Sequence, residues 1–251
     1  MILEENQTLT RYDRNSRTYA ASDGETVDLL NLALEAYTCI RIPAGHVTLV
    51  GHEKQCVDMM IRVPNDIRAE ITLRSVNMRG VNEPAVQLGE NSDLTLRVEG
   101  RNFLNRDGIR VPPAAQLTIA GEGELNVVNN RNYSIGIGAN CNDSYGTIII
   151  DLAGKLSIRS SGDKVVCLGG GRSTGEGIRI LRGVCCFQAS GHTVLGAGSI
   201  SGNAFINILD ASVSVSLEGD DAVGLGTFSG KASVHSAGQL RLLLNCQRAT
   251  G

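Results

Sequence analysis

Tryptophan is absent from the 251-residue sequence, and aromatic residues make up only 4% of it. A core must therefore be built from aliphatic side chains rather than from rings. No run of about 18 uncharged apolar residues occurs, so the sequence predicts no membrane insertion. Apolar residues nevertheless reach 42% and charged residues 20%. This balance excludes wholesale disorder and permits a packed core.

The chain also lacks an excess of positive charge. It carries 23 basic and 26 acidic residues, for a net charge of −3 at pH 7. General nucleic-acid binders show a clear positive excess, so no nucleic-acid partner is expected. The N-terminal segment has no apolar stretch behind a basic one and does not form a secretory signal. The expected compartment is the cytoplasm if Met1 is the native start, and the cell surface or exterior if a signal peptide has been removed.

Disulfide and zinc scaffolds are not expected. The cysteines are odd in number and include no CxxC pair, which is unlike both kinds of scaffold. The sequence therefore predicts free, mostly buried thiols. The seven cysteines are Cys39, Cys56, Cys141, Cys167, Cys185, Cys186 and Cys246.

Glycine, by contrast, is abundant, with 30 residues, and many of the glycines belong to a repeat. The repeat has the frame apolar–x–apolar–Gly or Pro, recurs at steps of 21 to 31 residues, and is separated by short segments of period-two alternation. One such coil cannot bury its apolar face alone, but stacked coils can. The frame occurs at 40–43, 61–64, 86–89, 109–112, 135–138, 166–169, 195–198 and 223–226.

The sequence thus predicts an all-β fold, a single-stranded right-handed parallel β-helix (β-solenoid) of about eight coils. The expected boundaries are 1–38 for an N-terminal segment with a capping helix, 39–245 for the β-helix and 246–251 for a C-terminal tail. The capping helix is expected at 25–36, after an N-cap at 22–23. No cap follows the apolar strand at 240–244, so either the chain continues there, as a further domain, or a partner such as another subunit covers that end.

The coils resemble a known group of proteins. The segments YSIGIGAN, VVCLGGG, VLGAGS and AVGLGTF, with GEGELNVV and GKLSIRSSGD, resemble the repeats of bacterial right-handed β-helix proteins of pectate-lyase-like shape. Within that superfamily they look most like clostridial Gly-rich surface and carbohydrate-binding-type repeats. The resemblance spans about residues 39–245 and implies a β-helix. Such repeats occur in lyases, hydrolases, adhesins and plain binding modules, so the resemblance implies no single activity.

Arginines occupy the middle of three repeat segments, at Arg41, Arg62 and Arg110. Rungs of a solenoid are about 4.8 Å apart, so Arg41 and Arg62 are expected to be adjacent like charges. Two alternatives are open. The arginines grip an anionic polymer, such as a uronate or sulfated glycan, through bidentate contacts, or they are solvated and offset by the acidic residues of the same half.

The corresponding positions of later coils are nearly free of side chains. Gly136, Gly196 and Gly224 are expected to face solvent there. Glycine weakens a strand unless something approaches the backbone closely, which predicts an interaction face for a partner surface or a flat ligand. The alternative is that these glycines only permit tight corners.

A further column, three residues before each repeat, contains Asp163, His192 and Asp220. A carboxylate–imidazole–carboxylate stack is suited to general acid–base work, as in a polysaccharide hydrolase or lyase. The surrounding segments are similar to pieces of polygalacturonase-type hydrolases, but the histidine precedes the double-Asp segment instead of following it. Turn residues of a structural kind are the alternative. Asp220, Asp221 and Glu218 are the only compact acidic group, so calcium has weak support and no metal or cofactor is expected.

The steps between repeats never exceed 31 residues, which leaves shallow walls around any site and favours binding over catalysis. The sequence therefore predicts a non-catalytic binding or assembly module that recognises a glycan or a protein surface along a flat face. One alternative is a polysaccharide-degrading hydrolase or lyase acting at the Asp–His–Asp column. A second is a scaffold or regulatory domain that docks another domain or subunit through its C-terminal end.

Overall fold

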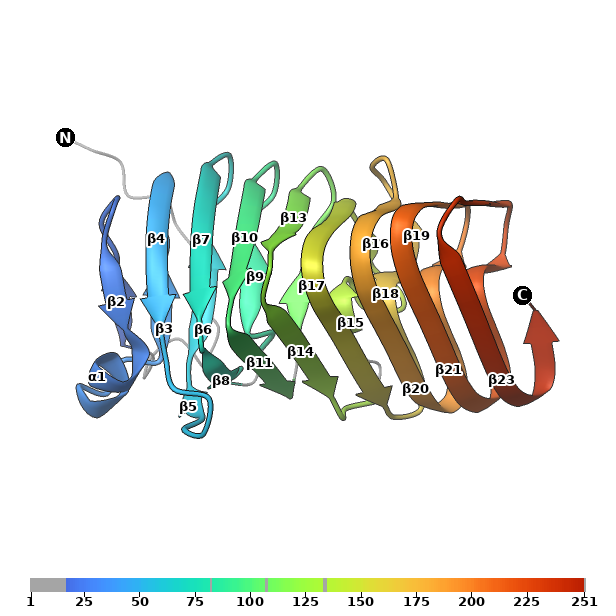
Figure 1. Cartoon of the computed structure of the whole chain (residues 1–251), viewed down its shortest axis with the longest axis horizontal. Helices are drawn as coiled ribbons and strands as arrows, with labels where there is room; N and C mark the ends of the chain where they lie inside the picture. Colours follow the sequence, from blue (N-terminus) through green and yellow to red (C-terminus); the bar gives the residue numbers. More distant parts are fainter. Residues whose placement is uncertain (1–16, 82, 107, 133–134, 251) are drawn as a thin grey trace.

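A computed structural model describes residues 17–81, 83–106, 108–132 and 135–250, with backbone only for 247–250. Its strands lie side by side in one long row, from the N-terminal to the C-terminal end (Figure 1). Every pairing between named strands in the described part is parallel and joins one coil to the next. The predicted all-β parallel β-solenoid is confirmed. It has about seven turns rather than the eight coils predicted from the repeat.

The strand pairings divide the solenoid surface into three faces. Face 1 holds the repeat segments; it consists of β1 (Thr18–Ala20), β3 (Cys39–Arg41), β6 (Met60–Val63), β9 (Val86–Leu88), β12 (Ile109–Arg110), β15 (Ile135–Gly138), β18 (Lys164–Gly170) and the last parts of β20 (Ile178–Ser201), β21 (Ala204–Ser229) and β23 (Gln239–Thr250).

Faces 2 and 3 complete each coil. Face 2 consists of β2 (Thr26–Asp28), β4 (Gly45–Val50), β7 (Arg68–Arg74), β10 (Asp93–Glu99), β13 (Gln116–Gly121), the first parts of β17 (Thr147–Ser161), β20 and β21, and β22 (Ala232–Ser236). Face 3 consists of β5 (Val57–Asp58), β8 (Asn77–Arg79), β11 (Arg101–Arg106), β14 (Glu124–Asn129), the second part of β17, the middle parts of β20 and β21, and the first part of β23.

Aliphatic ladders fill the interior. On face 2, one inward position carries an aliphatic side chain on five successive coils, and each of these side chains is 0% exposed. Burial of each such side chain contributes about 1.5–3 kcal/mol, so the stacked coils supply the core that a single coil lacks. The members of this ladder are Leu96, Ile119, Ile150, Ile180 and Ile208.

Face 1 contains a ladder of glycines that differs from the column Gly136, Gly196 and Gly224 considered from the sequence. Four glycines stack in register at the end of the repeat, each with a φ near +130° that L-residues rarely adopt. A Cβ on any of the first three would lie 1.8–1.9 Å from the carbonyl oxygen of the glycine in the next coil. The close approach of backbone to backbone therefore requires glycine in each coil but the last. The ladder is Gly138, Gly169, Gly198 and Gly226.

A small outer layer covers face 1 in the C-terminal half. Val166, Leu195 and Val223 are in register and 0–2% exposed, although they lie outside the main core. Cys141, Ile200 and Phe228, which follow the repeat segments along the chain, pack against these side chains. The connections also contain a pair of short strands, β16 (Ser144–Tyr145) and β19 (Arg172–Ser173). Tyr145 is fully buried and belongs to the main core, with its hydroxyl 3.2 Å from Ser199 Oγ.

The N-terminal end is closed by α1 (Leu29–Leu34), which buries Leu29 and Leu32. The prediction of a helix at 25–36 was too long at both ends. Asp28 is the N-cap and accepts hydrogen bonds from the amides of Leu30 and Asn31, at 2.8 and 3.2 Å. The segment before it forms β2, which pairs with β4, so the solenoid includes β1 and β2 and begins before residue 39. Among the described residues, no helix has the length and apolar character needed to cross a membrane.

Six of the cysteines are free thiols in the described residues: Cys56, Cys141, Cys167, Cys185, Cys186 and Cys246. Cys185 and Cys186 face opposite sides of β20, one buried and one half-buried. Burial raises the pKa of Cys167 and of Cys185 to about 12. Because the thiolate is the reactive form, iodoacetamide at about pH 8 is expected to modify the exposed Cys56 first and to reach Cys167 and Cys185 only after unfolding. Peptide mass spectrometry of native and urea-treated protein checks this order. Equal modification of Cys56 and Cys167 in the native protein would contradict it.

Candidate functional site

The predicted arginines form one column on face 1. The strand registers place Arg41 beside Arg62, Arg62 beside Gln87, and Gln87 beside Arg110, on four successive coils. Arg41 and Arg110 are exposed and Arg62 is half-buried. The structure thus brings together the three arginines that the repeat indicated, and we call them the arginine column.

Most other arginines in the N-terminal half of the chain have carboxylate partners. Most of those on faces 2 and 3 are held by carboxylates of neighbouring coils, four of them at 2.7–3.1 Å. Arg41 and Arg110, and Arg106 on face 3, form no ion pair with any side chain in the described ranges. Many acidic residues that might offset the arginine column are therefore engaged on other faces. The pairs are Arg68–Asp93, Arg74–Glu99, Arg79–Asp58 and Arg97–Glu70.

The column of glycines expected to continue the arginine column does not do so. Arg110 pairs with Gly138 rather than with Gly136, a shift of two residues. Gly136, Gly196 and Gly224 are buried and point inward: a Cβ on Gly136 would lie 2.4 Å from Ile158 Cγ2, and one on Gly196 would lie 2.6 Å from Val215 Cγ1. The prediction that these three glycines face solvent was therefore wrong. They leave room for core side chains, and the outer side of face 1 is covered in this half.

The Asp–His–Asp column lies at the corner between faces 3 and 1. His192 Nδ1 is 2.6 Å from Asp220 Oδ2, and the backbone carbonyl of Asp163 accepts hydrogen bonds of 2.9 Å from the amides of His192 and Thr193. The structure thus joins His192 to Asp220, while the contacts it shows for Asp163 are those of its backbone and not of its carboxylate. Both side chains of the pair are more than half exposed, at 55% and 54%. An ion pair in such contact with water is weak, and it is not sheltered as acid–base catalysts usually are.

A shallow groove of about 310 Å³ lies next to this pair along the chain, and it is lined by Arg159, Ser161, Ser190 and Glu218 among others. Arg159 donates from Nε to Gln188 Oε1 at 2.8 Å. Glu218, Asp220 and Asp221, which were considered for calcium, do not form a group placed to hold a metal ion in the part of the chain described.

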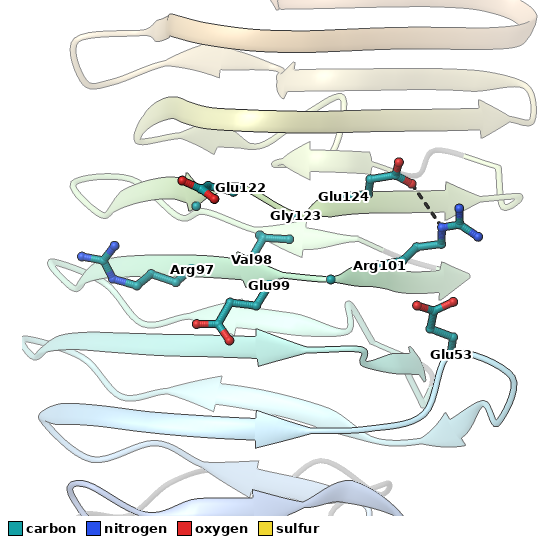
Figure 2. Close-up of a pocket in the computed structure, with 10 residues that line it drawn as sticks. Glu53, Arg97, Val98, Glu99, Arg101, Glu122, Gly123 and Glu124 are labelled. Carbon is teal, nitrogen blue, oxygen red and sulfur yellow. Dashed lines mark hydrogen bonds and ion pairs between the residues drawn. The ribbon is translucent and has the colours of Figure 1, made fainter.

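A larger groove, of about 770 Å³, lies where face 2 turns into face 3, and sequence reasoning missed it. Figure 2 shows Arg97 at one end and Arg101 with Glu124 at the other, with Glu53 reaching in from the connection between β4 and β5. Its lining includes four glutamates but two arginines, and both arginines are bound to glutamates through Nε, at 2.7 and 3.2 Å. A surplus of carboxylates makes this groove a poor site for a polyanion.

The groove exists because glycines turn the corner. A Cβ on Gly123 would lie 2.4 Å from the carbonyl oxygen of Gly100, so neither coil has a side chain on the floor. The sequence indication of this groove was the group of glycines at 100, 121 and 123, which lie where the face 2 strand of each coil passes into its face 3 strand. Glu53 lies just before β5, three coils before β14, and nothing in the sequence indicated that it reaches this groove.

Comparisons of the chain with protein-family models, with curated proteins and with solved structures found no match. Its function is therefore argued from its own geometry.

Proposed function

We propose that the protein is a non-catalytic binding module that holds an anionic glycan, rich in uronate or sulfate groups, across the arginine column of face 1. The observation that carries this proposal is the contrast among arginines. Arg41 and Arg110 are exposed and without a carboxylate partner in the described residues, while most of the arginines around them on faces 2 and 3 are ion-paired.

The stacking of Arg41 on Arg62 supports an anionic ligand. Neighbouring guanidinium groups one rung apart repel each other, and a carboxylate or sulfate between them relieves that repulsion. A guanidinium also binds such groups with two parallel hydrogen bonds. Because the strands of a solenoid are rigid, the donors are already in place before the ligand binds, which lowers the entropy lost on association.

A polymer suits this surface better than a small anion does. The column continues through Gln87 to Arg110, so its three charged groups span four coils whose rungs are about 4.8 Å apart. A chain with one acidic group per repeat meets several of them at once, and each contact adds to the affinity. The resemblance of the Gly-rich coils to carbohydrate-binding-type repeats supports a glycan as that polymer.

The triple variant Arg41→Ala/Arg62→Ala/Arg110→Ala is expected to lose binding to uronate-bearing or sulfated glycans. At about 1 kcal/mol for each of the three guanidinium contacts, the affinity falls roughly 100-fold. Binding by the wild type is also expected to weaken as salt is raised. A glycan array with neutral, uronate and sulfated members identifies the ligand, and calorimetry at two salt concentrations measures the loss.

A charge-matched control separates the column from general attraction. The variant Arg68→Ala/Arg74→Ala/Arg79→Ala removes three guanidinium groups that are ion-paired on faces 2 and 3. It has the same net charge as the column variant and is expected to bind like the wild type. Equal losses in both variants, or no glycan bound by the wild type, would overturn the proposal.

The alternative function, a polysaccharide hydrolase, is favoured by one observation, the contact between His192 and Asp220. The same array decides between the two functions when each bound glycan is also examined for cleavage. Products released by the wild type and not by Asp220→Asn would assign catalysis to this corner of the solenoid. Binding without products supports the binding module.

A further inference from the structure

The last coil leaves part of the apolar interior uncovered. Val234, Leu240 and Leu242 are 41%, 40% and 38% exposed. Each pairs with a residue that is at least 97% buried one coil earlier: Ile206, Val213 and Val215, respectively. The exposed side chains therefore belong to the inward columns of faces 2 and 3. This surface, made by β22 and the part of β23 on face 3, is called the tail.

The first coil has a different shape. In it α1 takes the place of a face 3 strand, and Leu34 at the end of α1 is 85% exposed. The strand β2 opens face 2 and, among the described residues, pairs only with β4. The surface made by β2 and α1 is called the head. A helix that carries an exposed leucine is the kind of element that covers an open solenoid end.

The two ends carry opposite charge. Residues 17–41 contain four acidic groups, Asp23, Glu25, Asp28 and Glu35, and two basic ones, Arg17 and Arg41. Residues 222–251 contain three basic groups, Lys231, Arg241 and Arg248, and no acidic group. Docking the head of one copy on the tail of another therefore brings unlike charges together, whereas docking two tails brings like charges together.

We propose that a second copy of this chain docks head to tail, with α1 of one copy over the face 3 part of β23 in the next, and β2 following β22 on face 2. Stacking in this direction preserves the winding of the coils, so β2 meets β22 as a parallel neighbour, the arrangement of every pairing between coils within the chain. The contact is heterologous, because the head of one copy meets the tail of another. Each added copy presents a new tail, so the product grows with concentration. This proposal is independent of glycan binding.

Two variants alter one end each without touching the core. Leu34→Glu changes the head at a side chain that is 85% exposed. Arg241→Glu/Leu243→Glu changes the tail at exposed, outward positions of β23, with Leu243 59% exposed. Sedimentation velocity is expected to show wild-type association that increases with protein concentration and decreases with salt. Each variant alone is expected to remain monomeric.

The mixture of the two variants is the decisive sample. The Leu34→Glu variant retains a working tail and the Arg241→Glu/Leu243→Glu variant a working head, so an equimolar mixture is expected to form a species of twice the monomer mass and nothing larger. Val184→Glu, at a 45% exposed site in the middle of face 3, serves as the control and is expected to associate like the wild type. A monomeric wild type at every concentration, a Leu34→Glu variant that still associates, or a mixture that stays monomeric would each overturn the proposal.

Discussion

Replacing Gly169 with alanine is expected to destabilise the solenoid by about 3–5 kcal/mol, the sum of backbone strain and forced displacement of the neighbouring coil. Gly169 has a φ of +117°, which an alanine adopts only with strain. Its Cβ would also lie 1.9 Å from the carbonyl oxygen of Gly198, and backbone atoms cannot move aside as a flexible side chain does. Urea titration followed by circular dichroism measures the loss as a fall in the unfolding midpoint.

Gly226→Ala is the matched control. Gly226 stands in the same ladder, with a φ of +135°, but the nearest atom to its Cβ is Ala232 Cβ at 3.2 Å. The backbone strain is shared by both variants, whereas the collision with the next coil occurs only in Gly169→Ala. We expect Gly226→Ala to lose about 1–2 kcal/mol, the strain alone. Equal midpoints for the two variants would show that the approach of adjacent coils is not what requires glycine here.

The fold could be predicted from the repeat, but the position of the glycines on face 1 could not. The repeat and its alternation identified stacked parallel coils. In the segment at 135–138, however, Ile135 and Ile137 fit the repeat equally well, and the structure pairs Ile109 with Ile137. A shift of one residue reverses the faces and conflicts with the alternation, but a shift of two does not. Sequence alone therefore placed Gly136 where Gly138 stands.

The stacking of the candidate site's arginines could be predicted because it follows from the repeat. The ion pairs between side chains of neighbouring coils could not be predicted. Arg41, Arg62 and Arg110 share one frame, so their stacking followed from the sequence. Arg74 binds Glu99, which is 25 residues away, and that pairing depends on the length of each coil and on rotamers. The sequence prediction placed the start of α1 too early. Thr26 and Val27 fit a helical pattern, but they pair with β4 as part of a strand, so the helix begins only after the N-cap Asp28.

Asn102→Ala is expected to destabilise the protein by about 2–4 kcal/mol, because it leaves the buried amide of Val76 without its partner and removes one of two hydrogen bonds to the carbonyl of Glu99. Asn102 is 0% exposed. Its Oδ1 accepts a hydrogen bond of 2.8 Å from the amide of Val76 in the previous coil, and its Nδ2 donates one of 2.9 Å to the carbonyl of Glu99. One side chain thus binds the backbone of two coils at a corner. The carbonyl of Glu99 also accepts a hydrogen bond of 3.4 Å from the amide of Ser75, so the amide of Val76 is the group that depends on Asn102.

The matched control for this variant is Asn126→Ala, one coil later. Asn126 is half-buried, and the hydrogen bond of its side chain among the described residues is a long one, 3.4 Å to the carbonyl of Asn102, so the expected loss is below about 1 kcal/mol. Asn102→Asp adds a test of the two-bond arrangement. A buried carboxylate accepts from Val76 but cannot donate to Glu99, whereas the protonated carboxyl does both. Burial raises the pKa of such a group above that in the unfolded chain, so the stability of Asn102→Asp relative to the wild type is expected to increase as the pH falls through that folded-state pKa. A relative stability that does not change with pH would show that the donated bond to Glu99 contributes nothing.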